Sequence, residues 1–140
     1  MTASFTWDKS KWDNFVKGLD FLNTSRDVAY QEAAANGWHS NDKEDDGVPN
    51  FGNYTSNLHS EASELWEAWR KGKLDSPCDK ADKMVQVDLL PLTCAEEEIA
   101  DIIIRALDTA ARLKVDVSKA VLNKLLFNRT RGYRYGGILA

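Results

Sequence analysis

The chain has 140 residues, of which 43% are hydrophobic and 29% are charged, and its formal net charge is −4. This length predicts a single domain over residues 1–140, and the composition is typical of a soluble globular protein. The acidic balance argues against a general nucleic-acid or membrane binder, because both need a basic surface. No apolar run reaches the length of a bilayer span, and no secretory signal is recognisable, so we expect a cytoplasmic protein.

Hydrophobic periodicity predicts three helices in the first half of the chain. Apolar residues recur at helical spacing over residues 10–22, and Ser25 is expected to cap a second helix that runs to Ala35. Residues 36–50 are rich in Gly, Pro, Asp and Asn and predict a loop. A third helix is expected from about Phe51 to Arg70, where the apolar spacing returns.

The second half of the chain begins with a long connection over residues 71–92, which are charged and irregular. Connections of this length usually indicate function or disorder. Thr93 and Glu96 then fit a capping box, which predicts a helix that continues to about Lys114. The side chains expected on its buried side are Ile99, Ile103, Ala106, Ala110 and Leu113.

A last helix is expected to begin after Asp116, as its cap, and to end near Arg131-Gly132. No strand-like alternation with hairpin turns is present. The predicted fold is therefore all-α, a bundle of four to five helices.

Two acidic pairs stand out, Glu61 with Glu64 and Glu98 with Asp101. Residues three apart lie on the same face of a helix, so two neighbouring helices can bring four carboxylates together. Such a concentration of negative charge is unfavourable without a cation, and oxygen ligands favour Mg²⁺ or Mn²⁺. The pattern indicates a metal-dependent enzyme acting on phosphates, although solvated surface acids explain the spacing equally well.

Three stretches of the sequence form a recognisable series. They are NFGNYTSNLHSEASELWEAWRKGK with its Glu-x-x-Glu motif, LTCAEEEIADIIIRALDTAARLKVD with its Glu-x-x-Asp motif, and KLLFNRTRGYRYGG. In this order they resemble the MazG-like family of all-α nucleoside triphosphate pyrophosphohydrolases. The resemblance covers roughly residues 26–137 and leaves residues 1–25 as an N-terminal extension.

The resemblance implies Mg²⁺-dependent hydrolysis between the α- and β-phosphates of a nucleoside triphosphate, with Mn²⁺ as a substitute ion. The implied metal ligands and catalytic acids are Glu61, Glu64, Glu98 and Asp101. The last-helix residues implied to contact phosphates and sugar are Lys124, Asn128 and Arg131; without the resemblance they indicate a solvated basic helix end.

The resemblance leaves the roles of several other residues open. Trp38 matches an aromatic position that can stack on the base, or it anchors the core. Ser60 stands where many relatives have a further acid, whose role Glu97 or a metal-bound hydroxide could take. Arg105 and Asp108 are expected either to pair on the helix surface or to reach the site, and we favour a supporting role for both.

The chain is also similar to phage MazG-like enzymes, including the MazZ type, which acts on dGTP. This similarity favours a purine deoxynucleotide such as dGTP as substrate, a role in nucleotide-pool control, and a homodimer or homotetramer. Three alternatives stay open: a housecleaning enzyme for pyrimidine deoxynucleotides, a phosphoribosyl-ATP-hydrolysing or ring-opening relative, and a non-catalytic helical protein that binds a partner.

Overall fold

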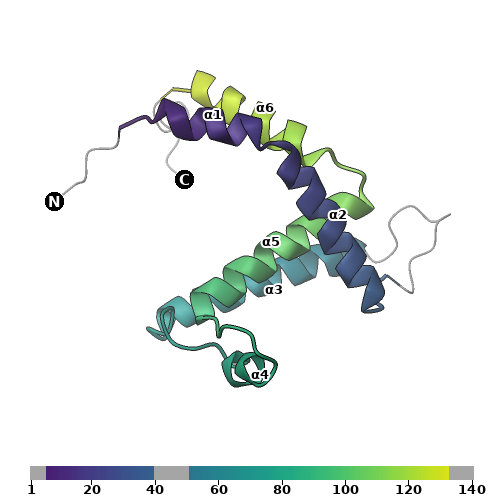
Figure 1. Cartoon of the computed structure of the whole chain (residues 1–140), viewed down its shortest axis with the longest axis vertical. Helices are drawn as coiled ribbons and strands as arrows, with labels where there is room; N and C mark the ends of the chain where they lie inside the picture. The colour runs from purple at the N-terminus through teal and green to yellow at the C-terminus, as the bar shows by residue number, and fades with distance from the viewer. Residues whose placement is uncertain (1–5, 40–50, 133–140) are drawn as a thin grey trace.

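The computed structural model describes residues 6–39 and 51–132, and these residues form α-helices and no strand (Figure 1). This confirms the predicted all-α class. The described residues contain six helices, one more than the largest number expected: α1 Lys9–Lys17, α2 Asp20–Ala35, α3 Phe51–Arg70, α4 Ala81–Gln86, α5 Cys94–Arg112 and α6 Val117–Thr130. None of these helices combines the length and the apolar character that crossing a membrane requires.

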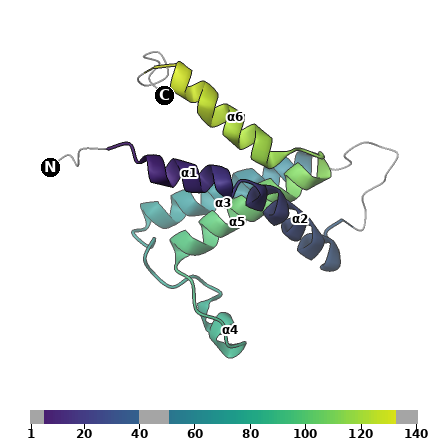
Figure 2. The same ribbon diagram turned by 45° about the horizontal axis from the view of Figure 1, so that its top comes forward.

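The centre of the molecule is the pair formed by α3 and α5, which lie side by side in both views (Figures 1 and 2). Helix α2 packs against α5, and α6 packs against α2. Helix α4 stands apart from this packing, at the end of the α3–α5 pair where α5 begins (Figure 1). Helices α3 and α5, which carry the two acidic pairs, are therefore neighbours, as the predicted four-carboxylate site requires.

The break between the first two helices was predicted at the wrong place. Helix α1 ends at Lys17 with Gly18 as its C-cap, and α2 already begins at Asp20, so Ser25 lies inside α2 and does not cap it. The Ser25 hydroxyl donates a 2.7 Å hydrogen bond to the Phe21 carbonyl one turn earlier. A serine can satisfy its hydroxyl in this way within a helix, which is why its cap signal misled the prediction.

The connection between α3 and α5 lies where it was expected, but it is more ordered than its sequence indicates. It contains the short helix α4, which the sequence did not predict. It also folds back on the start of α5: the Cys78 N–H donates to the Leu92 carbonyl at 2.9 Å, and the Cys94 N–H donates to the Ser76 carbonyl at 2.9 Å. These backbone bonds hold residues 76–78 against the residues at the start of α5.

The caps of the last two helices are confirmed. The Thr93 hydroxyl accepts from the Glu96 N–H, and the Glu96 carboxylate accepts from the Thr93 N–H, as a capping box requires. Helix α5 ends at Arg112, slightly before the expected Lys114. The Asp116 carboxylate accepts from the Lys119 N–H at the start of α6.

The predicted buried side of α5 is wrong for the chain as described. Four of the five residues are exposed and Ala110 is half-buried: Ile99, Ile103, Ala106, Leu113 and Ala110. Periodicity identifies an apolar stripe but not the neighbour that covers it, and α2 and α3 pack on other sides of α5. Among the described residues, the only buried hydrophobic side chains are Ala29, Cys78 and Ala81.

Candidate metal centre and adjoining cavity

Three of the four predicted ligand acids meet between α3 and α5. Glu61, Glu64 and Glu98 each offer a carboxylate oxygen, and these oxygens lie within 4.8 Å of one another. Glu61 is buried, whereas Glu64 is exposed and Glu98 is half-buried. Asp101 does not belong to this set; it lies about one turn further along α5, where it lines a cavity. The two predicted motifs therefore converge, with the fourth acid beside the cluster.

The cluster carries more negative charge than its surroundings balance. Burial and the neighbouring Glu64 carboxylate raise the pKa of Glu98 to about 7. Burial and the Glu61 charge raise the pKa of Asp101 as well. The Glu98 Oε2 atom is buried and accepts no hydrogen bond from the described residues. An oxygen-only donor set with an unpartnered buried oxygen fits a hard divalent cation such as Mg²⁺ or Mn²⁺.

Arg105 of α5 contacts the cluster directly: its Nε donates a 2.8 Å hydrogen bond to Glu61 Oε1. Its guanidinium also lies over the Trp38 ring, 5.1 Å from the ring centroid. The alternative of a surface ion pair between Arg105 and Asp108 is thus wrong. Asp108 instead pairs with His39 at 2.7 Å, and the other ring nitrogen of His39 lies 2.9 Å from the Tyr54 hydroxyl.

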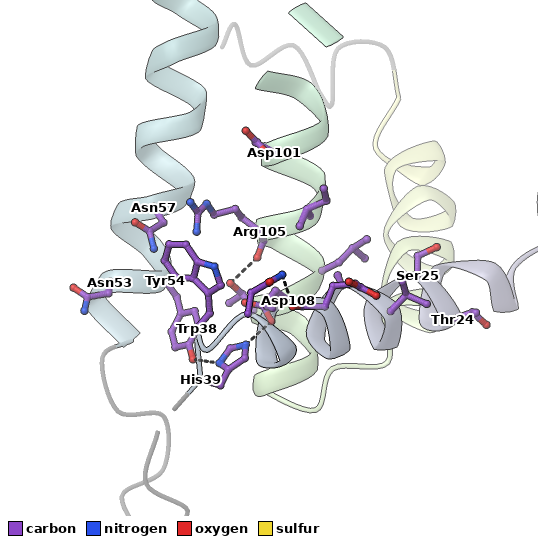
Figure 3. Close-up of a pocket in the computed structure, with 18 of the residues that line it drawn as sticks. Thr24, Ser25, Trp38, His39, Asn53, Tyr54, Asn57, Asp101, Arg105 and Asp108 are labelled. Carbon is purple, nitrogen blue, oxygen red and sulfur yellow. Dashed lines mark hydrogen bonds and ion pairs between the residues drawn. The ribbon is translucent and has the colours of Figure 1, made fainter. Parts of the chain in front are cut away.

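A cavity of about 930 Å³ is lined by Asp101 and by Arg105, the hydrogen-bond partner of Glu61; Figure 3 shows both residues among its walls. Its walls come from α2 and the residues after it up to His39, from the first half of α3, and from α5 between Asp101 and Thr109. Trp38 is 64% exposed and presents its ring to this space, and the amide side chains of Asn53 and Asn57 line the same wall. Asp101 links the cavity to the acidic cluster, so a ligand in the cavity lies next to the acids.

Glu97, considered as a substitute for the missing acid at Ser60, has a different partner. It is buried and forms a hydrogen-bonded ion pair with Lys80, which comes from the connection between α3 and α5. The Lys80 charge also lowers the pKa of Asp101, against the larger effect of burial. Glu97 is therefore neutralised by the protein itself and is a poor replacement for a ligand or base.

The predicted phosphate-binding residues Lys124, Asn128 and Arg131 lie on α6 or directly after it. Helix α6 packs on α2, and none of the three residues lines the cavity. The Lys124 ammonium lies 5.2 Å from the Phe127 ring centroid, and the buried Asn128 Oδ1 atom accepts no hydrogen bond from the described residues. Within one chain, these residues are not brought together with the acids.

Several cavity residues were not predicted from the sequence as site residues. Phe21, Thr24 and Ser25 belong to the part of the chain that lies outside the family resemblance, yet they line the cavity. The His39–Asp108 pair joins residues 69 positions apart. No local pattern in the sequence signals such a contact, because it depends on how α2 and α5 pack.

Comparison of the chain with models of protein families, with curated proteins and with solved structures gives no match. The acidic cluster and its cavity are therefore the observations from which a function can be inferred.

Proposed function

We propose that the chain is a Mg²⁺-dependent nucleoside triphosphate pyrophosphohydrolase of the MazG-like type, which converts a (d)NTP into the (d)NMP and pyrophosphate. The observation that carries this proposal is the convergence of three carboxylates beside a cavity large enough for a nucleoside. The proposed setting is the cytoplasm, where nucleoside triphosphates and Mg²⁺ are both abundant.

The proposed metal ligands are the predicted acids Glu61, Glu64, Glu98 and Asp101. The buried Glu98 oxygen has no hydrogen-bond partner among the described residues, and the pKa of Glu98 is raised; both support this role, because a bound cation removes both penalties. When bound, Mg²⁺ or Mn²⁺ supplies charge neutralisation of the phosphates and a more acidic water. Glu61, Glu64 and Glu98 would hold the ions between α3 and α5, next to the part of the cavity that Asp101 lines.

The cavity is the proposed site of the base and sugar. The exposed ring of Trp38 supports stacking on a base, and the Asn53 and Asn57 amides can hydrogen-bond to its edge. The volume of about 930 Å³ accommodates a purine, which agrees with dGTP as the preferred substrate. A pyrimidine deoxynucleotide also fits this volume and remains the closest alternative.

We further propose that the enzyme is a homodimer or homotetramer and that Lys124, Asn128 and Arg131 contact the triphosphate in the assembly. Support comes from the exposed apolar side of α5, where Ile103 is 52% exposed. Apolar stripes of this kind usually mark an interface. The same exposed side chains favour the other candidate function, a non-catalytic helical protein that binds a partner.

The decisive experiment incubates the protein with each common NTP and dNTP in Mg²⁺ or Mn²⁺ and separates the products by chromatography. We expect a monophosphate and pyrophosphate in equal amounts. Asp101→Asn should abolish turnover while the helical circular dichroism is retained. Glu67→Gln is the matched control, because this α3 acid pairs with surface Arg70 and should not affect turnover.

Absence of hydrolysis with every nucleotide would contradict the proposed activity. If Mg²⁺ binding measured by calorimetry were also unchanged by Glu64→Gln, the acids would be surface groups, and the partner-binding alternative would be favoured. Products other than a monophosphate and pyrophosphate would instead indicate a relative with a different reaction.

A further inference from the structure

Helix α5 carries a polar stripe that connects the acidic cluster to the cavity. Asp101, Arg105 and Asp108 follow one another at intervals of four and three residues, and all three line the cavity (Figure 3). At 1.5 Å per residue, Arg105 lies about 6 Å along the helix from Asp101. Arg105 therefore stands between the acids at one end and the aromatic part of the cavity at the other.

The charges of the cavity make Arg105 distinctive. Among the described residues that line it, Arg105 is the only lysine or arginine, while Glu32, Asp101 and Asp108 are acids. A ligand with a negatively charged group would be repelled near these acids, although Asp108 is already paired with His39. Among the described residues of this wall, the guanidinium of Arg105 is the only lysine or arginine charge that can attract an anion.

The arginine is also held in place and keeps unused donors. Nε donates to Glu61, and the guanidinium lies over the Trp38 ring. No described residue accepts a hydrogen bond from its terminal nitrogens, Nη1 and Nη2. These atoms can donate two parallel hydrogen bonds to a phosphate, a geometry that suits arginine.

We propose that Arg105 is a substrate-binding residue that holds the phosphate next to the sugar, the α-phosphate of the bound nucleotide. This inference rests on the proposed function, since it takes the cavity as the nucleoside site and the acids as the site of the outer phosphates. In this position Arg105 joins the two halves of the substrate, and its bond to Glu61 fixes the guanidinium before the nucleotide arrives.

The test measures binding of each common 2′-deoxynucleoside 5′-monophosphate and of its nucleoside, in the presence of Mg²⁺, by calorimetry. Wild-type protein should bind at least one monophosphate more tightly than the nucleoside. Arg105→Ala should reduce this preference about 10- to 100-fold, the effect of losing charge-assisted hydrogen bonds. Nucleoside binding itself should change much less.

Arg105→Lys keeps the positive charge and gives a second variant that retains the fold. It should recover only part of the preference for the monophosphate over the nucleoside, because lysine cannot donate two parallel hydrogen bonds to one phosphate. In the absence of nucleotide, Arg105→Ala should bind Mg²⁺ at least as tightly as wild type, because the change removes a cation that competes for Glu61. Arg70→Ala, which removes a surface arginine of α3 paired with Glu67, should leave both affinities unchanged.

An equal loss of monophosphate and nucleoside binding in Arg105→Ala would assign the residue a structural role and overturn the proposal. An unchanged preference in that variant would overturn it too, as would wild-type protein that binds none of the monophosphates. Failure of the proposed function is seen separately, as the absence of triphosphate hydrolysis by wild-type protein.

Discussion

Lys80, in the connection between α3 and α5, forms an ion pair with Glu97, whose side chain is only 7% exposed. The hydrogen bond with Glu97 is the largest contribution that raises the pKa of Lys80, so the lysine stays charged throughout the accessible pH range. This contact ties the connection to the first turn of α5, one residue before the cluster acid Glu98.

We expect Lys80→Ala to lower the free energy of unfolding by about 1–3 kcal/mol, since it leaves a buried carboxylate unpaired. The value is below that for a fully buried pair because Lys80 is itself half exposed. Urea denaturation measures the effect. Asp79→Ala, which removes an exposed acid 3.8 Å from Lys80, is the control and should change stability by less than about 0.5 kcal/mol.

The raised pKa of Glu98 predicts that the stability of the metal-free protein depends on pH. Folded protein keeps the Glu98 proton up to about pH 7, whereas the unfolded chain releases it near the ordinary value of 4.5. The unfolded state therefore binds fewer protons in this window, and stability falls as pH rises from about 4.5 to 7. Thermal melts in EDTA should show this decrease.

Glu98→Gln should flatten the decrease, because glutamine has no proton to release, and Glu67→Gln should retain it. Added Mg²⁺ should raise the melting temperature of wild-type protein more at pH 8 than at pH 5.5, since ligand carboxylates must be ionised. Parallel pH profiles for wild type and Glu98→Gln would contradict the assigned environment of Glu98.

Trp38→Ala should weaken binding of the nucleoside about 5- to 100-fold, the range typical of losing one stacked base contact. Trp38→Phe should retain most of the affinity, because a smaller ring still stacks. Calorimetry with the best-bound nucleoside measures both. Trp69→Ala, which removes an exposed ring stacked on Trp66 at the far end of α3, is the control. Equal losses in the Trp38 and Trp69 variants would argue against a specific stacking role.

Cys78 should be inert in the folded protein. Its side chain is buried, and burial raises the pKa of its thiol, so little thiolate is present at pH 7.5. Iodoacetamide labelling followed by mass spectrometry should therefore modify Cys78 only after denaturation. Labelling in native protein at the rate of a small free thiol would show that the connection opens and exposes it.

Structural features that depend on only a few neighbouring residues were predicted correctly from the sequence. The helix over residues 51–70, the capping box at Thr93 and the cap at Asp116 all depend on groups within about one turn of each other. Ser25 shows the limit of this reasoning, because the same hydroxyl can cap a helix or bond inside one. Helix α4 was missed because its six residues are too few to show a clear helical periodicity within a polar segment.

By itself, the sequence determined the all-α class and which acids share a helix face, because both follow from periodicity along one chain. The tertiary structure alone decided that Glu61 and Glu98 converge, that Arg105 reaches across 44 positions to Glu61, and that Lys80 neutralises Glu97 across 17. These contacts join distant segments, and their energies depend on packing and burial that no local pattern encodes. The same reason explains why the predicted buried side of α5 was wrong. The apolar periodicity is visible in one helix, whereas burial of that side depends on which helices pack against it.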